Sequence, residues 1–556
     1  MSKPLRVAFV CSEVAGFSKT GGLADVCRAL PLALAALGHE VRILTPFYAS
    51  VPGQDDFTVV LPTLDVPLGG RLLAGKIRGT TLVSGNSGVD ASVALHFLEH
   101  QEFFNRPGFY DEGGSAYFDN AIRFGLLSAA GLAWCEALDW IPDILHLHDW
   151  HTAVGALYLR QRRDLDSRWC KTRSVLTLHN AGYQGHGPLD QADALGIPWE
   201  LRNQEIFEDH GQLNLLKGGI ALADKLNAVS PGYAGELLTP LGGHGLHVHF
   251  QRREADLAGI LNGVEESSWN PASDPHLPTN YSLKDRSGKQ PCKSALQQHF
   301  GLPEKLEIPL FGMVSRLTEQ KGFGYLIPAL EQWLASASSS EFGNGLSSND
   351  SLHSHSGRSG AATRNPRDVQ AVLDSRFRGN DNRDEGAPLT SGHDPEFQVV
   401  MLGSGDEHLR KALDRLAAIH PGRLGWIHGY DDPLAHLIEA GSDFFLMPSL
   451  YEPCGLNQIY SLRYGTLPIV RAVGGLKDTV ANYDPETGGG TGFVFHDPTP
   501  EALLGTLNWV LETWQHRRPH LRTMQRQAMR KRFSWVKSAR QYVKLYRSAR
   551  KNASSR

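Results

Sequence analysis

One pattern recurs along the chain: a short run of apolar residues, then a polar or glycine-rich turn, then a stretch with helical periodicity. The first copy has its apolar run at residues 5–11, turns at Lys19-Thr20-Gly21-Gly22, continues as a helix over 23–37 and reaches a second apolar run at 41–44. A run that is apolar throughout is typical of a strand buried on both faces of a sheet. This segment therefore predicts a strand–helix–strand unit with a glycine turn at the start of its helix.

The pattern returns often enough to indicate the fold class. Further apolar runs, each followed by a polar or glycine turn, cover residues 143–147, 174–178, 225–229, 308–314, 398–402, 443–447 and 467–470. Strands that alternate with helices form parallel sheets. Because these strands are too many for one ordinary open sheet, the sequence predicts an α/β protein with two doubly wound domains.

Composition indicates where the domains divide. Residues 267–290 are polar and contain Pro271, Pro275 and Pro278, as an irregular connection would. We therefore predict an N-terminal domain over 1–265, a second domain over 266–515 and a C-terminal segment over 516–556. Residues 336–394 are crowded with Ser, Gly, Asn, Asp and Arg. We expect a disordered insertion in a surface loop there, with a regulatory loop as the alternative.

Charge and cysteine content exclude several classes of protein. With 55 Lys and Arg against 59 Asp and Glu, the net charge is −4, which argues against non-specific electrostatic binding of nucleic acid by the whole chain. The 6 cysteines include no CxxC pair, as expected for a reduced, cytoplasmic chain. Neither a signal peptide nor an apolar run long enough to cross a membrane is evident. After Glu512 the charged residues are all basic, and we interpret them as a solvated helix face rather than a polyanion site.

Two segments carry groups that suit a diphosphate. Gly21 and Gly22 stand at a predicted helix start, where backbone N–H groups can approach a phosphate, and Lys19 adds a positive charge beside them. Arg316 stands at the carboxyl end of a predicted strand, and Lys321 lies in the turn that follows. A guanidinium and an ammonium can neutralise a diphosphate without a metal. The alternative for the glycines is that they only form a tight turn. The alternative for Arg316 and Lys321 is that they only form surface salt bridges with acidic side chains.

Two further segments place titratable side chains after predicted strands. In His146-Leu147-His148-Asp149-Trp150-His151, either the histidines and the aspartate form a metal cluster, or Asp149 caps the next helix while pointing into a cleft. Glu452 precedes a predicted helix, where a carboxylate can bind sugar hydroxyls or stabilise a developing positive charge. Cys454 has no evident general base, so we interpret it as a packing or ligand-lining residue rather than a nucleophile.

Taken together, these motifs resemble the bacterial glycogen synthases and plant starch synthases of glycosyltransferase family 5. The matching segments occur in the family's order, at residues 19–26, 148–151, 177–180, 261–264, 315–317, 320–322, 452–456, 464–468 and 474–476. The resemblance implies the GT-B fold, with two Rossmann-like domains facing across a cleft and final helices, within 516–556, that cross back to the first domain. It implies transfer of glucose from ADP-glucose to the non-reducing end of an α-1,4-glucan such as glycogen, with retention of configuration. It implies no metal and no other cofactor.

The resemblance also assigns roles to residues. Arg316 and Lys321 would hold the donor diphosphate and stabilise the departing ADP. Glu452 would bind the donor glucose and help to stabilise its cationic transition state. Asp149 would contact the donor or acceptor sugar, and His179 would place its side chain or carbonyl near the anomeric carbon. The other expected donor-site residues are Lys19, Gly21, Gly22, Tyr117, Asn262, Cys454, Gly455, Leu456 and Tyr460.

The chain departs from the family pattern at a few positions, and other functions stay open. Glu265 stands where the family often has Asp, and Tyr460 stands where the wider pattern has a second glutamate. One alternative is a related transferase that uses UDP-glucose and a small acceptor. An inactive glucan-binding protein is disfavoured because the expected cations and carboxylates are present. A nicotinamide dehydrogenase is disfavoured because no GxGxxG follows the first strand. The sequence does not indicate an oligomeric state.

Overall fold

The computed structural model describes residues 3–84, 91–266, 268–336 and 396–551. By its contacts the chain divides into one compact unit, residues 1–331 with 397–556, and a second unit, residues 332–396. Apart from Ser336, the insertion expected at 336–394 lies outside the described residues. In the part of the chain that is described, no helix is long and apolar enough to cross a bilayer.

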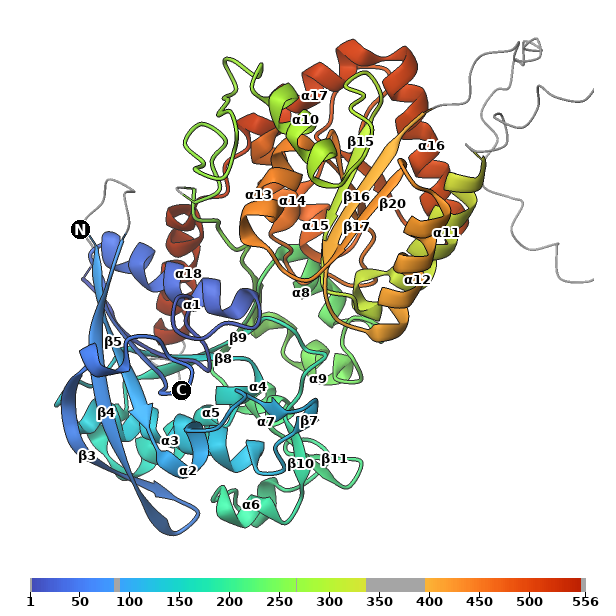
Figure 1. The fold of residues 1–556 in the computed structure, drawn as a ribbon. Helices are drawn as coiled ribbons and strands as arrows, with labels where there is room; N and C mark the ends of the chain where they lie inside the picture. Colours follow the sequence, from blue (N-terminus) through green and yellow to red (C-terminus); the bar gives the residue numbers. More distant parts are fainter. Residues whose placement is uncertain (1–2, 85–90, 267, 337–395, 552–556) are drawn as a thin grey trace, which may run out of the picture. The chain divides into compact units, whose positions relative to one another are not determined.

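A nine-stranded sheet is built by the first part of the chain (Figure 1), in the order β14-β13-β9-β8-β1-β2-β5-β4-β3. Strands β14 to β5 run parallel, whereas β4 and β3 are antiparallel to their neighbours. The strands are β1 (Arg6–Val10), β2 (Glu40–Pro46), β3 (Thr58–Leu68), β4 (Arg71–Val83), β5 (Ser92–Glu99), β8 (Ile144–His148), β9 (Arg173–Leu178), β13 (Lys225–Ala228) and β14 (Leu257–Gly259).

The antiparallel edge corrects the expectation of a purely parallel sheet. β3 and β4 are joined at Gly69 and Gly70, whose φ angles of 56° and 74° lie in the left-handed region. Two consecutive residues with positive φ favour the tight turn of a hairpin, because the twist of such a turn matches that of the strands. The hairpin extends the sheet without a crossover helix.

Helices and short ribbons surround this first sheet. The helices are α1 (Gly22–Ala36), α2 (Gln101–Phe104), α3 (Asn120–Ala137), α4 (Asp149–Ala153), α5 (Gly155–Leu165), α6 (Gln191–Ala194), α7 (Leu215–Leu222), α8 (Pro231–Leu237) and α9 (His247–Arg252). The ribbons are β6 (Asp111–Glu112) with β7 (Ser115–Ala116), and β10 (His186–Pro188) with β12 (Gln212–Asn214) and β11 (Glu208–Asp209).

A six-stranded parallel sheet, in the order β17-β16-β15-β18-β19-β20, is built by the second part. Its strands are β15 (Leu310–Val314), β16 (Gln398–Gly403), β17 (Leu424–His428), β18 (Phe444–Met447), β19 (Leu467–Arg471) and β20 (Phe493–Phe495). The helices are α10 (Lys289–His299), α11 (Phe323–Ser336), α12 (Glu407–Ile419), α13 (Asp432–Gly441), α14 (Asn457–Tyr464), α15 (Gly474–Thr479), α16 (Pro500–His516), α17 (Arg518–Arg530) and α18 (Trp535–Lys551).

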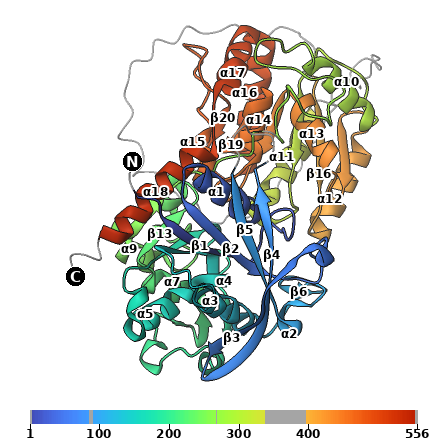
Figure 2. The same cartoon turned by 90° about the vertical axis from the view of Figure 1, so that its left-hand side faces the viewer.

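The last helices pack on different sheets. α17 contacts α14 and α16, whereas α18 contacts α1 and β9, and Figure 2 shows α18 beside α1. The Tyr542 hydroxyl of α18 accepts a hydrogen bond from the Asn227 side chain at 2.8 Å. α18 therefore packs against the first sheet. The domain boundaries at 265 and 515 stay predictions.

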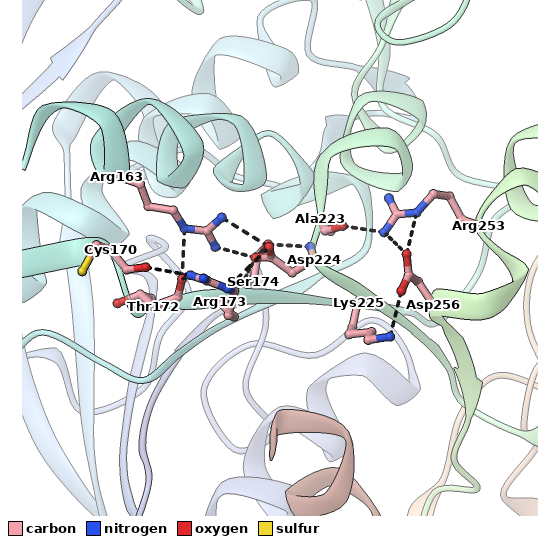
Figure 3. Close-up of polar contacts among 10 residues, drawn as sticks. All are labelled: Arg163, Cys170, Thr172, Arg173, Ser174, Ala223, Asp224, Lys225, Arg253 and Asp256. Atoms are coloured by element: carbon pink, nitrogen blue, oxygen red, sulfur yellow. Dashed lines mark hydrogen bonds and ion pairs between the residues drawn. The ribbon is translucent and has the colours of Figure 1, made fainter. Parts of the chain in front are cut away.

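Ion pairs join β9 and β13 at the ends where these strands begin (Figure 3). Asp224 accepts hydrogen bonds from Arg163 and from the backbone N–H of Ser174, the latter at 2.7 Å. Lys225 and Arg253 both pair with Asp256, at 2.7 and 3.1 Å. Ligands of open α/β sheets bind at the opposite, carboxyl edge. We therefore assign this network to the stability of the sheet.

Candidate active site

Asp149 lies at the carboxyl edge of the first sheet, directly after β8. Its φ of 51° is uncommon for a residue other than glycine, and such strain is concentrated at functional sites. Its Oδ1 accepts hydrogen bonds from the backbone N–H groups of His179 (2.6 Å) and Asn180 (3.3 Å), which follow β9. The sequence left open that Asp149 caps the next helix, but its side chain does not cap α4. The carboxylate instead connects the end of β8 to the end of β9. Burial raises the pKa of Asp149 to about 7, although these hydrogen bonds act in the opposite direction.

The neighbouring histidines form a buried hydrogen-bonded chain. His148 Nδ1 lies 3.0 Å from His179 Nε2. His146 contacts the Thr177 hydroxyl at 2.7 Å through Nε2 and the Tyr546 hydroxyl at 2.9 Å through Nδ1. With both ring nitrogens engaged, His146 is not available as a metal ligand. Among the described residues, its neighbours His148, Asp149 and His151 also form no group whose ligand atoms lie close enough together to hold a metal ion. Burial lowers the pKa of His179 to about 3, so its imidazole is neutral.

Glu452 lies at the carboxyl edge of the second sheet, in the loop between β18 and α14. This buried carboxylate accepts hydrogen bonds through Oε2 from Lys321 Nζ (2.5 Å) and Ser449 Oγ (3.0 Å). The Glu452 carbonyl accepts a hydrogen bond from the Gly475 N–H at 3.1 Å. A Cβ atom on Gly474 would lie only 2.0 Å from that carbonyl oxygen. The paired glycines at the start of α15 therefore let the Glu452 loop approach this helix.

Cys454 and Asn262 lie together beside this loop. Burial raises the pKa of the Cys454 thiol to about 12, and hydrogen bonds with Asn262 act against that rise. A neutral, buried thiol is a packing group rather than a nucleophile. The Oδ1 atom of Asn262 is buried and has no hydrogen-bond partner in the described part of the chain. Such an acceptor is costly to leave unpaired, and a sugar hydroxyl would satisfy it.

The remaining residues of this loop set its shape. Gly455 has a φ of 70°, and a Cβ atom there would lie 2.4 Å from the Gln458 side-chain oxygen. Leu456 follows as the residue that precedes α14. Tyr460, on α14, stacks on Trp269 with ring centroids 4.0 Å apart. The loop conformation therefore requires glycine at position 455.

The glycine turn before α1 has open space beside its backbone. A Cβ atom on Gly21 or Gly22 would meet no atom within 4 Å. Packing within the chain therefore does not require glycine at either position, whereas close approach of a ligand to the backbone would. Lys19 is mostly exposed and pairs with Asp25 at 2.8 Å.

Direct contacts link some of the predicted site residues to one another but not others. Lys321 pairs with Glu452, Asp149 holds the backbone of His179, and Asn262 contacts Cys454. No hydrogen bond or ion pair in the described residues links Lys19, Arg316 or Tyr117 to Glu452, Asp149 or His179. Arg316 is exposed after β15, and the ring of Tyr117 lies 4.8 Å from the guanidinium carbons of both Arg106 and Arg123.

Two groups near these residues were not expected from the sequence. Buried Glu13 accepts hydrogen bonds from the Thr20 N–H and hydroxyl, both at 2.6 Å, and from the Tyr110 hydroxyl. Glu13 thereby positions the glycine turn. The side chains of Tyr451, next to Glu452, and Asn180, next to His179, both lie beside Gly182, where a Cβ atom would be 3.4 Å from the Tyr451 hydroxyl and 3.0 Å from Asn180 Oδ1. Glu13 follows β1 as Asp149 follows β8, so its position after a strand was the available signal.

The paired sheets and the cations and carboxylates at their carboxyl edges define a glycosyltransferase of the GT-B fold. The structure is similar to the catalytic domain of starch synthase IV from Arabidopsis thaliana bound to ADP and acarbose, with a TM-score of 0.78, 28% identity and coverage of 99% of this chain and 100% of that chain. It also shares its fold with sucrose-phosphate synthase from Thermosynechococcus elongatus, with a TM-score of 0.52, 16% identity and coverage of 98% of each chain.

Sequence comparisons narrow the class to a family. The family described as starch synthase catalytic domain matches residues 6–252, and glycosyl transferases group 1 matches 387–532. The glycogen synthase of Aeromonas salmonicida is 42% identical over 98% of both chains. That of Vibrio cholerae is 41% identical over 98% of this chain and 99% of its own. The chain belongs to the glycogen synthase family of glycosyltransferases.

Proposed function

We propose that the protein transfers glucose from ADP-glucose to the non-reducing end of an α-1,4-glucan with retention of configuration, and that it does so without a metal. The observation that carries the proposal is the ion pair between Lys321 and the buried Glu452, at the edge of the second sheet to which Arg316 also belongs. The family membership supports glucan elongation. The similar starch synthase IV, which binds ADP and acarbose, supports the choice of donor nucleotide.

In this proposal the cations near the second sheet bind the donor diphosphate. Arg316 is exposed and able to form paired hydrogen bonds with phosphate oxygens. Lys321 is paired with Glu452 in the structure. A diphosphate would share the Lys321 ammonium, and the Glu452 carboxylate would then face the glucose. As the sugar–phosphate bond breaks, fixed cations stabilise the leaving ADP and the carboxylate stabilises the positive charge on the sugar.

Asp149 completes this proposed arrangement from the first sheet. Two backbone N–H groups hold one of its oxygens, so the second is available to a sugar hydroxyl. The His179 imidazole is hydrogen-bonded to His148. We therefore assign any contact of His179 with the donor sugar to its backbone carbonyl, one of the two possibilities that the sequence left.

The test is incorporation of labelled glucose into glycogen, from ADP-glucose and separately from UDP-glucose, with EDTA present. Strong incorporation from ADP-glucose alone is the expected result. Incorporation only from UDP-glucose would assign the other donor. Loss of activity in EDTA that Mg²⁺ restores would contradict the metal-free mechanism. No incorporation by folded protein from either donor would leave the transferase with a small acceptor, or an inactive glucan-binding protein.

A further inference from the structure

We propose that His276, Asp432 and His436 form a binding site for a divalent transition-metal ion such as Zn²⁺. One ligand atom from each side chain lies within 4.8 Å of the other two. His436 and Asp432 belong to α13, and His276 belongs to the segment between the two sheets. The site takes no part in the transfer proposed above, and its test requires no activity assay.

A buried carboxylate prepares His436 to bind a metal. His436 Nδ1 lies 2.7 Å from Asp274 Oδ2, and both side chains are almost fully buried. Because the carboxylate accepts the proton of Nδ1, the lone pair of the imidazole is on Nε2. That atom faces Asp432, whose Oδ2 is 3.9 Å away. A histidine whose other nitrogen is bonded to a carboxylate is the usual arrangement around protein-bound zinc.

The same carboxylate also fixes the segment that carries His276. Asp274 Oδ1 accepts a hydrogen bond from the His276 backbone N–H at 2.9 Å, and the Tyr464 hydroxyl donates to Oδ2. The His436 ring is held from the side as well, because it stacks on Trp269 with centroids 3.7 Å apart and an interplanar angle of 11°. The backbone of one proposed ligand and the ring of another are therefore positioned before any ion arrives.

The chemistry of the ligands indicates the class of ion. Two imidazoles and one carboxylate suit Zn²⁺ and related transition metals, whereas Mg²⁺ and Ca²⁺ prefer oxygen ligands alone. His276 and Asp432 are exposed, so an ion has access and water can complete its coordination. The Tyr430 hydroxyl donates to Asp432 Oδ1 at 2.7 Å, which leaves Oδ2 for the ion.

The competing interpretation is that His436 serves only the packing around Trp269. In that case an exposed histidine at position 276 is incidental, and its removal changes nothing. Substitutions at His276 separate the two interpretations because its side chain is exposed, and because its contact with Asp274 is made by the backbone N–H, which a substitution keeps. His299, which is exposed and lies outside the cluster, provides a matched control.

The experiment is calorimetric titration of the metal-stripped, full-length protein with ZnCl₂, without nucleotide sugar. The wild type is expected to bind one ion with a Kd on the order of micromolar. His276→Leu should weaken this site about 10-fold or more, whereas His299→Leu should not, and His276→Cys should retain it because thiolates bind Zn²⁺. Asp274→Asn should weaken it about 10- to 100-fold, if circular dichroism shows a folded variant.

Several results would overturn the proposal. One is the absence of Zn²⁺ binding by the wild type. A second is equal binding by the wild type and His276→Leu, and this variant decides the matter even if Asp274→Asn does not fold. A third is equal affinity for MgCl₂ and ZnCl₂, which would contradict a site built on imidazoles.

Discussion

At the residue scale, Asp149 carries two unfavourable features. Its carboxylate is buried, which is costly when the group is charged, and its backbone is left-handed, which is uncommon outside glycine. Its pKa of about 7, against 3.8 for a free side chain, means that the folded protein holds this proton more tightly than the unfolded chain does. The corresponding stability is present below pH 4 and is lost as the pH rises to about 7. We infer that the residue is retained for its chemistry at the expense of stability.

Asp149→Asn should therefore stabilise the protein while it removes activity. The amide carries no charge to bury and tolerates a positive φ. The pKa difference between 3.8 and about 7 limits the gain to about 4 kcal/mol above pH 7. Thermal unfolding should show a larger rise in Tm at pH 8 than at pH 5, with kcat reduced at least about 10²-fold.

Asp139→Asn is the control for the backbone contribution. Asp139 also has a positive φ, 47°, but it is exposed. Its substitution should give a small change in Tm that is the same at both pH values. A rise in Tm for Asp149→Asn that does not depend on pH would contradict the assigned pKa.

Glucose transfer should require the negative charge of Glu452 and not only a side chain of its size. Glu452→Gln keeps the hydrogen bond from Ser449 but removes the carboxylate that faces Lys321. We expect kcat to fall about 10²-fold with a smaller change in the KM for the donor. Glu439→Gln is the matched control, because burial raises the pKa of Glu439 well above its usual range and its protonated form resembles the amide. Initial rates from ADP-glucose that are unchanged in Glu452→Gln would contradict the role of this residue.

At the scale of elements, the glycine pair at the start of α15 sets the position of the Glu452 loop. A Cβ atom on Gly475 would lie 2.1 Å from the Cys454 carbonyl oxygen. Gly475→Ala should therefore displace the loop, lower kcat/KM at least about 10-fold and destabilise the protein by about 1–3 kcal/mol. Gly505→Ala, on α16, is the control, because its Cβ would meet no atom within 4 Å. Denaturant unfolding and donor kinetics of both variants check this, and equal behaviour of the two would contradict it.

The sequence predicted elements with continuous apolar runs and missed those without. β8 is buried at every position and follows the predicted run closely. β3 begins with exposed and half-buried residues, so it has no continuous run, and the signal of its hairpin was the Gly69-Gly70 pair. Site residues that follow strands were predicted in the same way, as with Asp149. Glu13 also follows a strand, but that signal alone does not separate it from other residues after strands, and its partners Thr20 and Tyr110 identify it only once the chain is folded.

At the scale of the molecule, the two parts of the chain cap each other's helices. The Gly232 N–H of α8 donates to Asp478 of α15, and the Gly474 N–H of α15 donates to Glu236 of α8, both at 2.6 Å. Ser230 Oγ donates to the Pro453 carbonyl, also at 2.6 Å. Each cap satisfies N–H groups that a helix start leaves unpaired. The Glu452 loop is thus attached to the carboxyl edge of the first sheet as well as to its own.

The place of residues 338–392 in the chain, between α11 and β16, predicts that they are dispensable for transfer. α11 ends at Ser336 and β16 begins at Gln398, and β16 pairs with β15 in a continuous register. In the described part of the chain, Lys321 and Glu452 are held by each other and by Ser449, all of which lie outside 338–392. Because the cost of closing a loop changes slowly with its length, a short Gly/Ser linker in place of 338–392 should leave kcat within about threefold of the wild type.

The control for this deletion is a variant with the same residues replaced by a Gly/Ser segment of equal length, which separates length from sequence. Both variants should elongate glycogen at similar rates. If the two are folded by circular dichroism but inactive, the segment regulates or completes the site, and the alternative of a regulatory loop is correct. If only the short linker is inactive, the connection between α11 and β16 requires length, and the composition of the insertion has no role in transfer.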